Sequence, residues 1–168
     1  PCEGGGQATK SIDIRFYDES EPPAVVFCID STGSMPGAVV RTNIKSVVDD
    51  LAAALPALRL GLVTFKDRTS NPDEQEEYGF TTNIATFKSW VDGIQFTQGY
   101  PTYEENPLDA LMYAKDMAAG WYIALATDNP FHYAGDGWGY TNLTKAQVIS
   151  ALAAAGCSVF IDATATYS

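Results

Sequence analysis

"VVFCIDSTGSM", residues 25–35, joins an apolar run to a cluster of side chains that carry oxygen atoms. The apolar part, residues 25–29, predicts a buried strand, because a strand covered on both faces is apolar without alternation. Asp30, Thr32 and Ser34 follow at the point where this strand has to leave the core. Oxygen atoms at such a position can cap the start of a helix or bind a cation, and the rest of the chain has to decide between the two.

Strand-like and helix-like patterns alternate along the rest of the chain. Apolar runs predict strands, and apolar residues spaced three or four apart predict helices. The expected strands cover residues 58–67, 78–82, 121–128 and 157–163, and the expected helices begin at Pro36 or cover 85–94, 106–118 and 144–155. This order predicts an α/β fold with a doubly wound, mostly parallel central sheet flanked by helices. Ligands of such folds bind at the carboxyl ends of the strands.

Length and composition predict one domain with a short extension. The expected domain covers residues 24–168, and residues 1–23 form an N-terminal extension. Within the extension, apolar and polar residues alternate at 11–17, which predicts a strand.

The charge balance argues against two classes of partner. The 168 residues carry 10 basic and 21 acidic side chains, a formal net charge of -11. Nucleic-acid binding needs clusters of Lys and Arg, so we expect no nucleic-acid partner. No apolar run approaches the roughly 18 residues of a membrane span, so we expect no membrane insertion. The acidic surplus is compatible with cation binding, although most of the acids are expected on a solvated surface.

Two further side chains add oxygen atoms at the same edge of the predicted sheet. Thr102 precedes a predicted helix, and Asp128 ends a predicted strand. Together with Asp30, Thr32 and Ser34, they make a set of two carboxylates and three hydroxyls that contains no Cys or His. Such a set of hard oxygen ligands suits Mg²⁺ and similar cations better than Zn²⁺.

This set resembles the metal-ion-dependent adhesion site of the von Willebrand factor A domain. The family pattern is Asp-x-Ser-x-Ser after the first strand, a threonine in a later loop and an aspartate after the fourth strand. Asp30, Thr32 and Ser34 match the first part, with Thr in place of the first Ser. With this match, we expect cation binding and not capping alone.

Later parts of the chain are similar to the same family. Thr102 matches the family threonine by its spacing to the following helix, whereas Thr97 lies too far from that helix and is the weaker candidate. Asp128 matches the family aspartate, although Asn129 follows it where the family usually has Gly. The phrases "LRLGLVTFKD" and "AGCSVFI" are similar to the second and fifth strands, so the resemblance runs over about residues 24–161.

The resemblance implies a metal-dependent module for adhesion or ligand binding. It implies one cation, Mg²⁺ with Mn²⁺ or Ca²⁺ as alternatives, and a protein partner that donates a Glu or Asp carboxylate to it. It implies an extracellular or cell-surface location. The alternative is a cytoplasmic assembly module of a chelatase or AAA-type complex, which has the same site. Family members usually continue with a sixth strand and a final helix, which we expect this chain, ending at Ser168, to lack.

Three residues near the predicted ligands are candidates for a rim that contacts the partner. Tyr103 follows the predicted threonine ligand, and His132 and Trp138 lie in the long loop after Asp128. The aromatic residues of this loop could form an exposed rim or could fold into the core.

Enzyme chemistry has weak support in the sequence, and we expect a protein that is not an enzyme. A triad of Cys28, His132 and Asp128 would need an exposed and reactive thiol, but Cys28 lies inside an apolar strand. No serine lies in a nucleophile elbow. Three cysteines do not make a disulfide framework, and pairing of Cys2 with Cys157 is left open.

Overall fold

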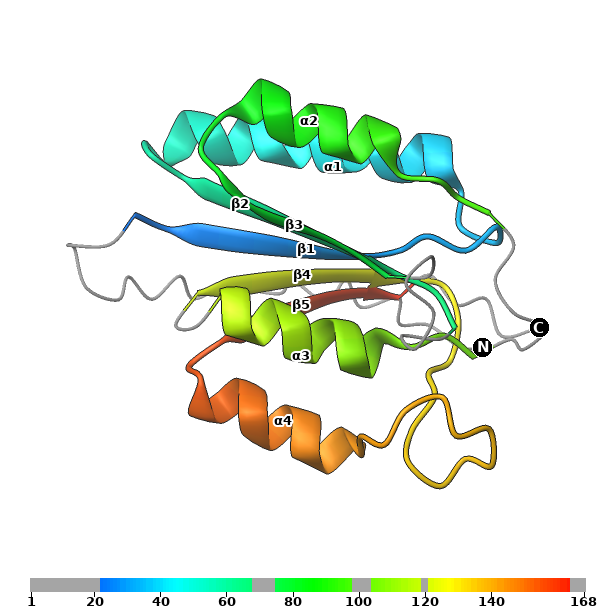
Figure 1. Cartoon of the computed structure of the whole chain (residues 1–168). Coiled ribbons are helices and arrows are strands. Elements are labelled where there is room, and N and C mark those ends of the chain that lie inside the picture. The colour runs from blue at the N-terminus through cyan, green and yellow to red at the C-terminus, as the bar shows by residue number, and fades with distance from the viewer. Residues whose placement is uncertain (1–21, 68–74, 98–103, 119–120, 164–168) are drawn as a thin grey trace, which may run out of the picture.

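The computed structural model describes residues 22–67, 75–97, 104–118 and 121–163. In these residues one sheet lies between two pairs of helices (Figure 1). Several predictions fall outside the described residues: the strand at 11–17, Cys2, Thr102 and Tyr103.

The order of strands and helices confirms the predicted α/β class. The elements are β1 (Ala24–Asp30), α1 (Gly37–Ala54), β2 (Arg59–Phe65), β3 (Glu76–Thr81), α2 (Ile84–Gly93), α3 (Pro107–Met117), β4 (Tyr122–Thr127), α4 (Lys145–Ala154) and β5 (Ser158–Ala163). Their ends lie within two residues of the predicted ones. Among the described helices, none combines the length and the apolar character needed to cross a bilayer.

The sheet is mostly parallel, and its strand order is β3-β2-β1-β4-β5. β1 pairs in parallel with β2 and β4, and β4 pairs in parallel with β5, whereas β3 runs antiparallel to β2. The chain first builds the sheet outward from β1 on one side and then returns to build the other side. The order therefore reverses at β1, which makes the carboxyl ends of β1 and β4 the expected ligand position.

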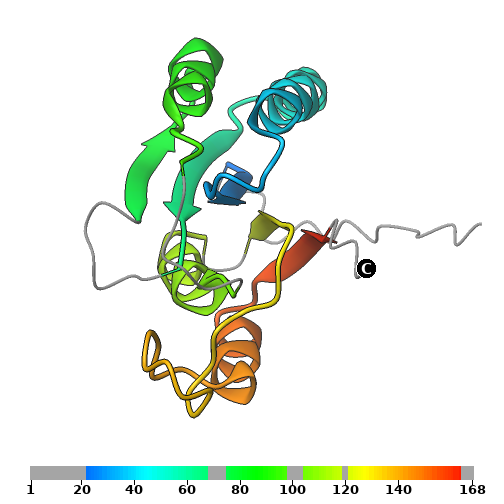
Figure 2. The same cartoon turned by 90° about the vertical axis from the view of Figure 1, so that its right-hand side faces the viewer.

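Helices cover both faces of β1. α1 and α2 lie on one face of the sheet, and α3 and α4 lie on the other (Figures 1 and 2). Every residue of β1 is buried, as its unbroken apolar run predicts. On the α2 side, Phe87 is fully buried, and its ring centroid lies 5.4 Å from that of Phe27 in β1. This double cover holds the end of β1 in a fixed place.

The starts of α4 and α1 differ in whether a side chain caps the helix. Thr144 and Gln147 form a capping box at α4: the Gln147 N–H donates to Thr144 Oγ1 at 3.2 Å, and the Thr144 N–H donates to Gln147 Oε1 at 2.8 Å. At α1, by contrast, the N-cap residue is Pro36 and no side chain caps the helix. Ser34 therefore has another role than capping.

Candidate metal centre

Asp30 ends β1, and both of its carboxylate oxygens are held in place. Oδ1 accepts hydrogen bonds from the Thr32 N–H at 2.9 Å and from Thr32 Oγ1 at 2.7 Å. Oδ2 accepts from Oγ1 of Thr127, the last residue of β4, at 2.9 Å. The side chain is fully buried. The carboxylate of Asp30 is thus positioned by its own loop and by the neighbouring strand.

Ser34 connects this loop to Asp128 after β4. Ser34 Oγ lies 3.0 Å from Thr32 Oγ1 and donates to Asp128 Oδ1 at 3.1 Å. The structure therefore brings together Asp30, Thr32, Ser34 and Asp128, although 94 residues separate Ser34 from Asp128. Parallel pairing of β1 with β4 explains this, because it places the carboxyl ends of both strands at one edge.

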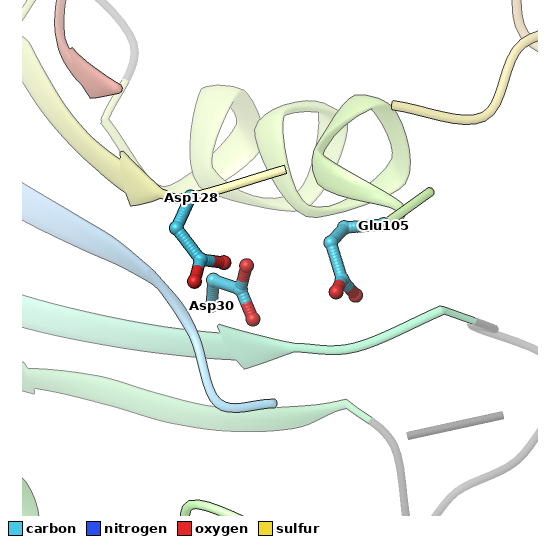
Figure 3. Close-up of side chains that lie close together, drawn as sticks. All are labelled: Asp30, Glu105 and Asp128. Atoms are coloured by element: carbon cyan, nitrogen blue, oxygen red, sulfur yellow. The ribbon is translucent and has the colours of Figure 1, made fainter. Parts of the chain in front are cut away.

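Glu105 is a third acid at this edge and was not among the ligands predicted from the sequence. Carboxylate oxygens of Asp30, Glu105 and Asp128 lie within 4.8 Å of one another (Figure 3). Two backbone hydrogen bonds hold Glu105 against the loop after β4: its N–H donates to the Pro130 carbonyl at 2.9 Å, and the His132 N–H donates to its carbonyl at 2.7 Å. Its position directly before a predicted helix, in the same segment as Thr102, was the available signal.

The side-chain amide of Asn129 contacts Ser34, Glu105 and Asp128. Its Nδ2 lies 3.1 Å from Asp128 Oδ1, 3.2 Å from Glu105 Oε1 and 3.3 Å from Ser34 Oγ. A Gly, which has no side chain, could not make these contacts. The donor set is made of oxygen atoms only, which fits Mg²⁺, Mn²⁺ or Ca²⁺.

Burial and mutual repulsion work against three ionised acids at one place. Burial above all raises the pKa of Asp30 to about 6, and the charge of Asp128 adds to this rise, while hydrogen bonds from Thr32 and Thr127 lower it. Burial also raises the pKa of Glu105 to about 10, helped by the charge of Asp30 and by a contact with the carboxyl group of Asp67. A divalent cation would remove this conflict, because it favours the ionised forms.

The pKa values predict how stability depends on pH when no cation is bound. The pKa values of folded Asp30 and Glu105 exceed their ordinary values of 3.8 and 4.5, so between these values the folded state binds more protons than the unfolded state. Stability should therefore rise as pH falls. Glu105 contributes from about pH 10 downward, and Asp30 contributes below about pH 6. We expect a higher melting temperature in EDTA at about pH 5 than at about pH 7.5.

The control for this prediction is to measure the same two melting temperatures in saturating Mg²⁺ in place of EDTA. A bound cation competes with protons for the same oxygens and stabilises the folded state by mass action. The difference in melting temperature between the two pH values should therefore shrink in Mg²⁺. A melting temperature in EDTA that falls between pH 7.5 and pH 5 would contradict the prediction.

The predicted rim is only partly at the surface. His132 does not belong to it: the ring is fully buried, and Nδ1 lies 2.6 Å from Asp136 Oδ2. The His132 ring also packs edge-on against Tyr140, at 4.8 Å between ring centroids. Trp138 is 52% exposed and stacks on Tyr140. The sequence could not place His132, because its buried partner lies within the same long loop and not in a predicted element.

Thr97, the weaker threonine candidate, lies beside the first loop. Its N–H donates to the Ser31 carbonyl at 3.2 Å, and its backbone pairs with that of Thr32. Its hydroxyl accepts a hydrogen bond from Lys66 Nζ at 2.7 Å. Thr97 thus lies next to the loop of Thr32, with its hydroxyl engaged by a lysine.

Cys28 lies in the core and is not suited to nucleophilic chemistry. The side chain is fully buried, and Sγ lies 3.8 Å from the Ala110 carbonyl of α3. Burial raises the pKa of the thiol far above its ordinary value. A thiol in this state supplies almost no thiolate, the form that attacks.

Solved structures of similar fold include those of two bacterial proteins. One is the pilus adhesin SpaC from Lactobacillus rhamnosus GG. Its two crystal structures give TM-scores of 0.62 and 0.59, with 15% and 16% identity over 86% of this chain. The other is the conserved hypothetical protein BatB from Bacteroides thetaiotaomicron, with a TM-score of 0.55 and 18% identity over 83% of this chain.

These similarities establish a shared fold only, because the identities are low. The chain spans 24% and 25% of the length of the SpaC chains and 65% of the BatB chain. No family model and no curated protein matches the sequence.

Proposed function

We propose that this chain is a von Willebrand factor A-type module that binds a partner protein through a divalent cation. The cation lies at the carboxyl ends of β1 and β4 and is held by the set selected from the sequence together with Glu105: Asp30, Thr32, Ser34, Thr102, Asp128 and Glu105. The single observation that carries the proposal is the continuous contact of Asp30, Thr32, Ser34 and Asp128 at one edge of the sheet.

The arrangement of these oxygens supports binding of a further ligand to the cation. Mg²⁺ requires six oxygen ligands in near-octahedral geometry and usually keeps several water molecules. Hydroxyl groups of Thr32 and Ser34 are neutral ligands, so they leave more of the cation's charge unbalanced than carboxylates would. Ser34 and Asp128 lie at the solvent side of the cluster, because Ser34 is exposed and Asp128 half-buried. A partner carboxylate can then replace a water molecule on the cation from that side.

Two observations support a binding role: the similarity of the fold to that of a pilus adhesin, and the burial of Cys28. The similar fold of a pilus adhesin supports an adhesive function and an extracellular location for this module. We propose a binding protein and not an enzyme, since the thiol that a cysteine mechanism would need is buried. We propose a single protein partner that offers a Glu or Asp side chain.

Mn²⁺ in place of Mg²⁺ allows a direct test, because Mn²⁺ accelerates the relaxation of protons in water molecules bound to it. We expect the protein to bind Mn²⁺ with an enhanced water-proton relaxation rate. A short peptide with one Glu should lower this enhancement by displacing the bound water, and EDTA should abolish it. The same peptide with Gln in place of Glu is the matched control and should have little effect. Equal effects of the two peptides, or no Mn²⁺ binding, would refute the proposal.

A further inference from the structure

We propose that residues 11–17 form a strand that pairs with the outer edge of β5. The alternating pattern of this segment predicts a strand, and the order of the described strands indicates which edge of the sheet can accept it. The pairing would extend the sheet by one strand. It does not require a bound cation, so it can be tested separately from the proposed function.

β5 presents an apolar edge of the sheet. It lies at one end of the five described strands, and its outer edge faces no other strand among them (Figure 2). Phe160 is 41% exposed and Ile161 is 61% exposed. Consecutive residues of a strand point to opposite faces, so apolar side chains reach the surface on both faces of this edge. Asp162 is the only charged residue of β5. An edge strand with these properties readily pairs with another strand.

β3, at the other end of the sheet, is protected in ways that β5 is not. Its first two residues, Glu76 and Glu77, are exposed acids. Its pairing with β2 also has an irregular register between Leu60 and Leu62. Charged side chains and bulges at an edge discourage pairing with a further strand. Residues 11–19 contain three acids and one base, so the two Glu side chains would also repel this segment.

Residues 11–17 have the pattern of a strand that covers an apolar edge. Ile12, Ile14 and Phe16 alternate with polar residues, so in an extended chain the three apolar side chains share one face. The segment has seven residues, and β5 has six. Pairing with β5 would therefore remove apolar area of both strands from water, which stabilises the pair.

The connection to β1 determines how this strand can run. The Arg59 Nε–H donates to the Pro22 carbonyl at 3.3 Å, and the Arg59 N–H donates to the Pro23 carbonyl at 2.8 Å, so this part of the chain is held at the start of β2. Tyr17 lies five residues before Pro22, and five extended residues span at most about 17 Å.

This reach is sufficient for one direction only. A strand beyond β5 lies three strand spacings from β1, which is about 14 Å. A strand antiparallel to β5 would end near the start of β5, so its connection has to cross little more than this distance. A parallel strand would end near the other end of β5, and its connection would also have to return along the strand by about 20 Å. The strand formed by residues 11–17 therefore runs antiparallel to β5.

Hydrogen–deuterium exchange of the full chain in EDTA tests the pairing, because amides in paired strands exchange slowly. We expect slow exchange in residues 11–17 of the wild type. A variant that loses the apolar face of the segment should exchange at least roughly tenfold faster both in residues 11–17 and in residues 158–163, since each lost apolar contact weakens the pairing. This variant combines Ile12→Ser, Ile14→Ser and Phe16→Ser.

The matched control changes the opposite face of the same segment. Asp13→Ser combined with Arg15→Ser leaves the apolar residues in place, so exchange in residues 158–163 should stay close to that of the wild type. Residues 24–30 of β1 should exchange slowly in every variant, which shows that the sheet is folded. If the triple variant does not fold, Ile14→Ser alone is measured in its place.

Four outcomes would overturn the proposal. Exchange in residues 11–17 of the wild type as fast as in an unstructured peptide would refute the strand. Unchanged exchange in residues 158–163 of the triple variant would refute pairing with β5. Faster exchange in residues 76–81 instead would assign the segment to the edge of β3. Protection of residues 158–163 that rises with the concentration of the chain would show that a second copy occupies this edge.

Discussion

Replacing Asp30 by Asn is expected to lower the affinity for Mn²⁺ by roughly a hundredfold to a thousandfold. The substitution removes one negative charge beside the cation and keeps the size of the side chain. Two unit charges about 4 Å apart interact by about 4 kcal/mol at an effective dielectric constant of 20, and each 1.4 kcal/mol corresponds to about a tenfold change in affinity. Asn is preferred to Ala, because Ala would leave donors of Thr32 and Thr127 without their acceptor. Calorimetric titration with Mn²⁺ measures the effect.

Two comparisons show whether the loss of affinity comes from the site. Asp92→Asn removes the same charge at the surface and should change the affinity by about twofold or less, since exposed charges are screened. Without cations, Asp30→Asn should be at least as stable as the wild type, because it removes a buried charge whose pKa is raised to about 6. Equal Mn²⁺ affinity in Asp30→Asn and the wild type would contradict the assignment of Asp30 as a ligand.

Replacing Phe87 by Ala is expected to lower the free energy of unfolding by about 3–5 kcal/mol. Phe87 is fully buried between α2 and the sheet. Its ring centroid lies 5.4 Å from that of Phe27 and 6.1 Å from that of Trp90. Truncation removes apolar area from the core and leaves a cavity that these rings can fill only in part. Urea denaturation, followed by far-ultraviolet circular dichroism, measures the change.

Phe160→Ala is the matched control for this prediction. Phe160 lies in β5 and is 41% exposed, and its ring centroid lies 5.8 Å from that of Tyr122. Its truncation should cost less than about half as much, since less apolar area is lost from the interior. Under conditions where Phe87→Ala is folded, its Mn²⁺ affinity should be close to that of the wild type, because Phe87 is not one of the proposed ligands. Similar costs for the two variants would contradict the assignment of Phe87 to the core.

Sequence patterns predicted the order of the strands along the chain, but they did not predict the full order of the strands within the sheet. Apolar runs and helical spacing predicted each described element, because burial on a sheet and on a helix imposes different periods on the sequence. The parallel order explained why residues following β1 and β4 would meet, and the structure brings Asp30, Thr32, Ser34 and Asp128 together. A compact motif of hydroxyl and carboxyl groups at a strand end is visible in a sequence, because its members lie within a few residues.

Tertiary structure alone decided the positions of Glu105 and His132. Glu105 is an acid in a predicted loop, and only the pairing of residue 105 with residue 131 brings it to the cluster. His132 seemed a surface residue, but Asp136 and Tyr140 enclose its ring. The sequence therefore determined the fold class and the first half of the site, since these depend on local periodicity and spacing. Burial of single charged residues depends on contacts between distant segments, which no local pattern records.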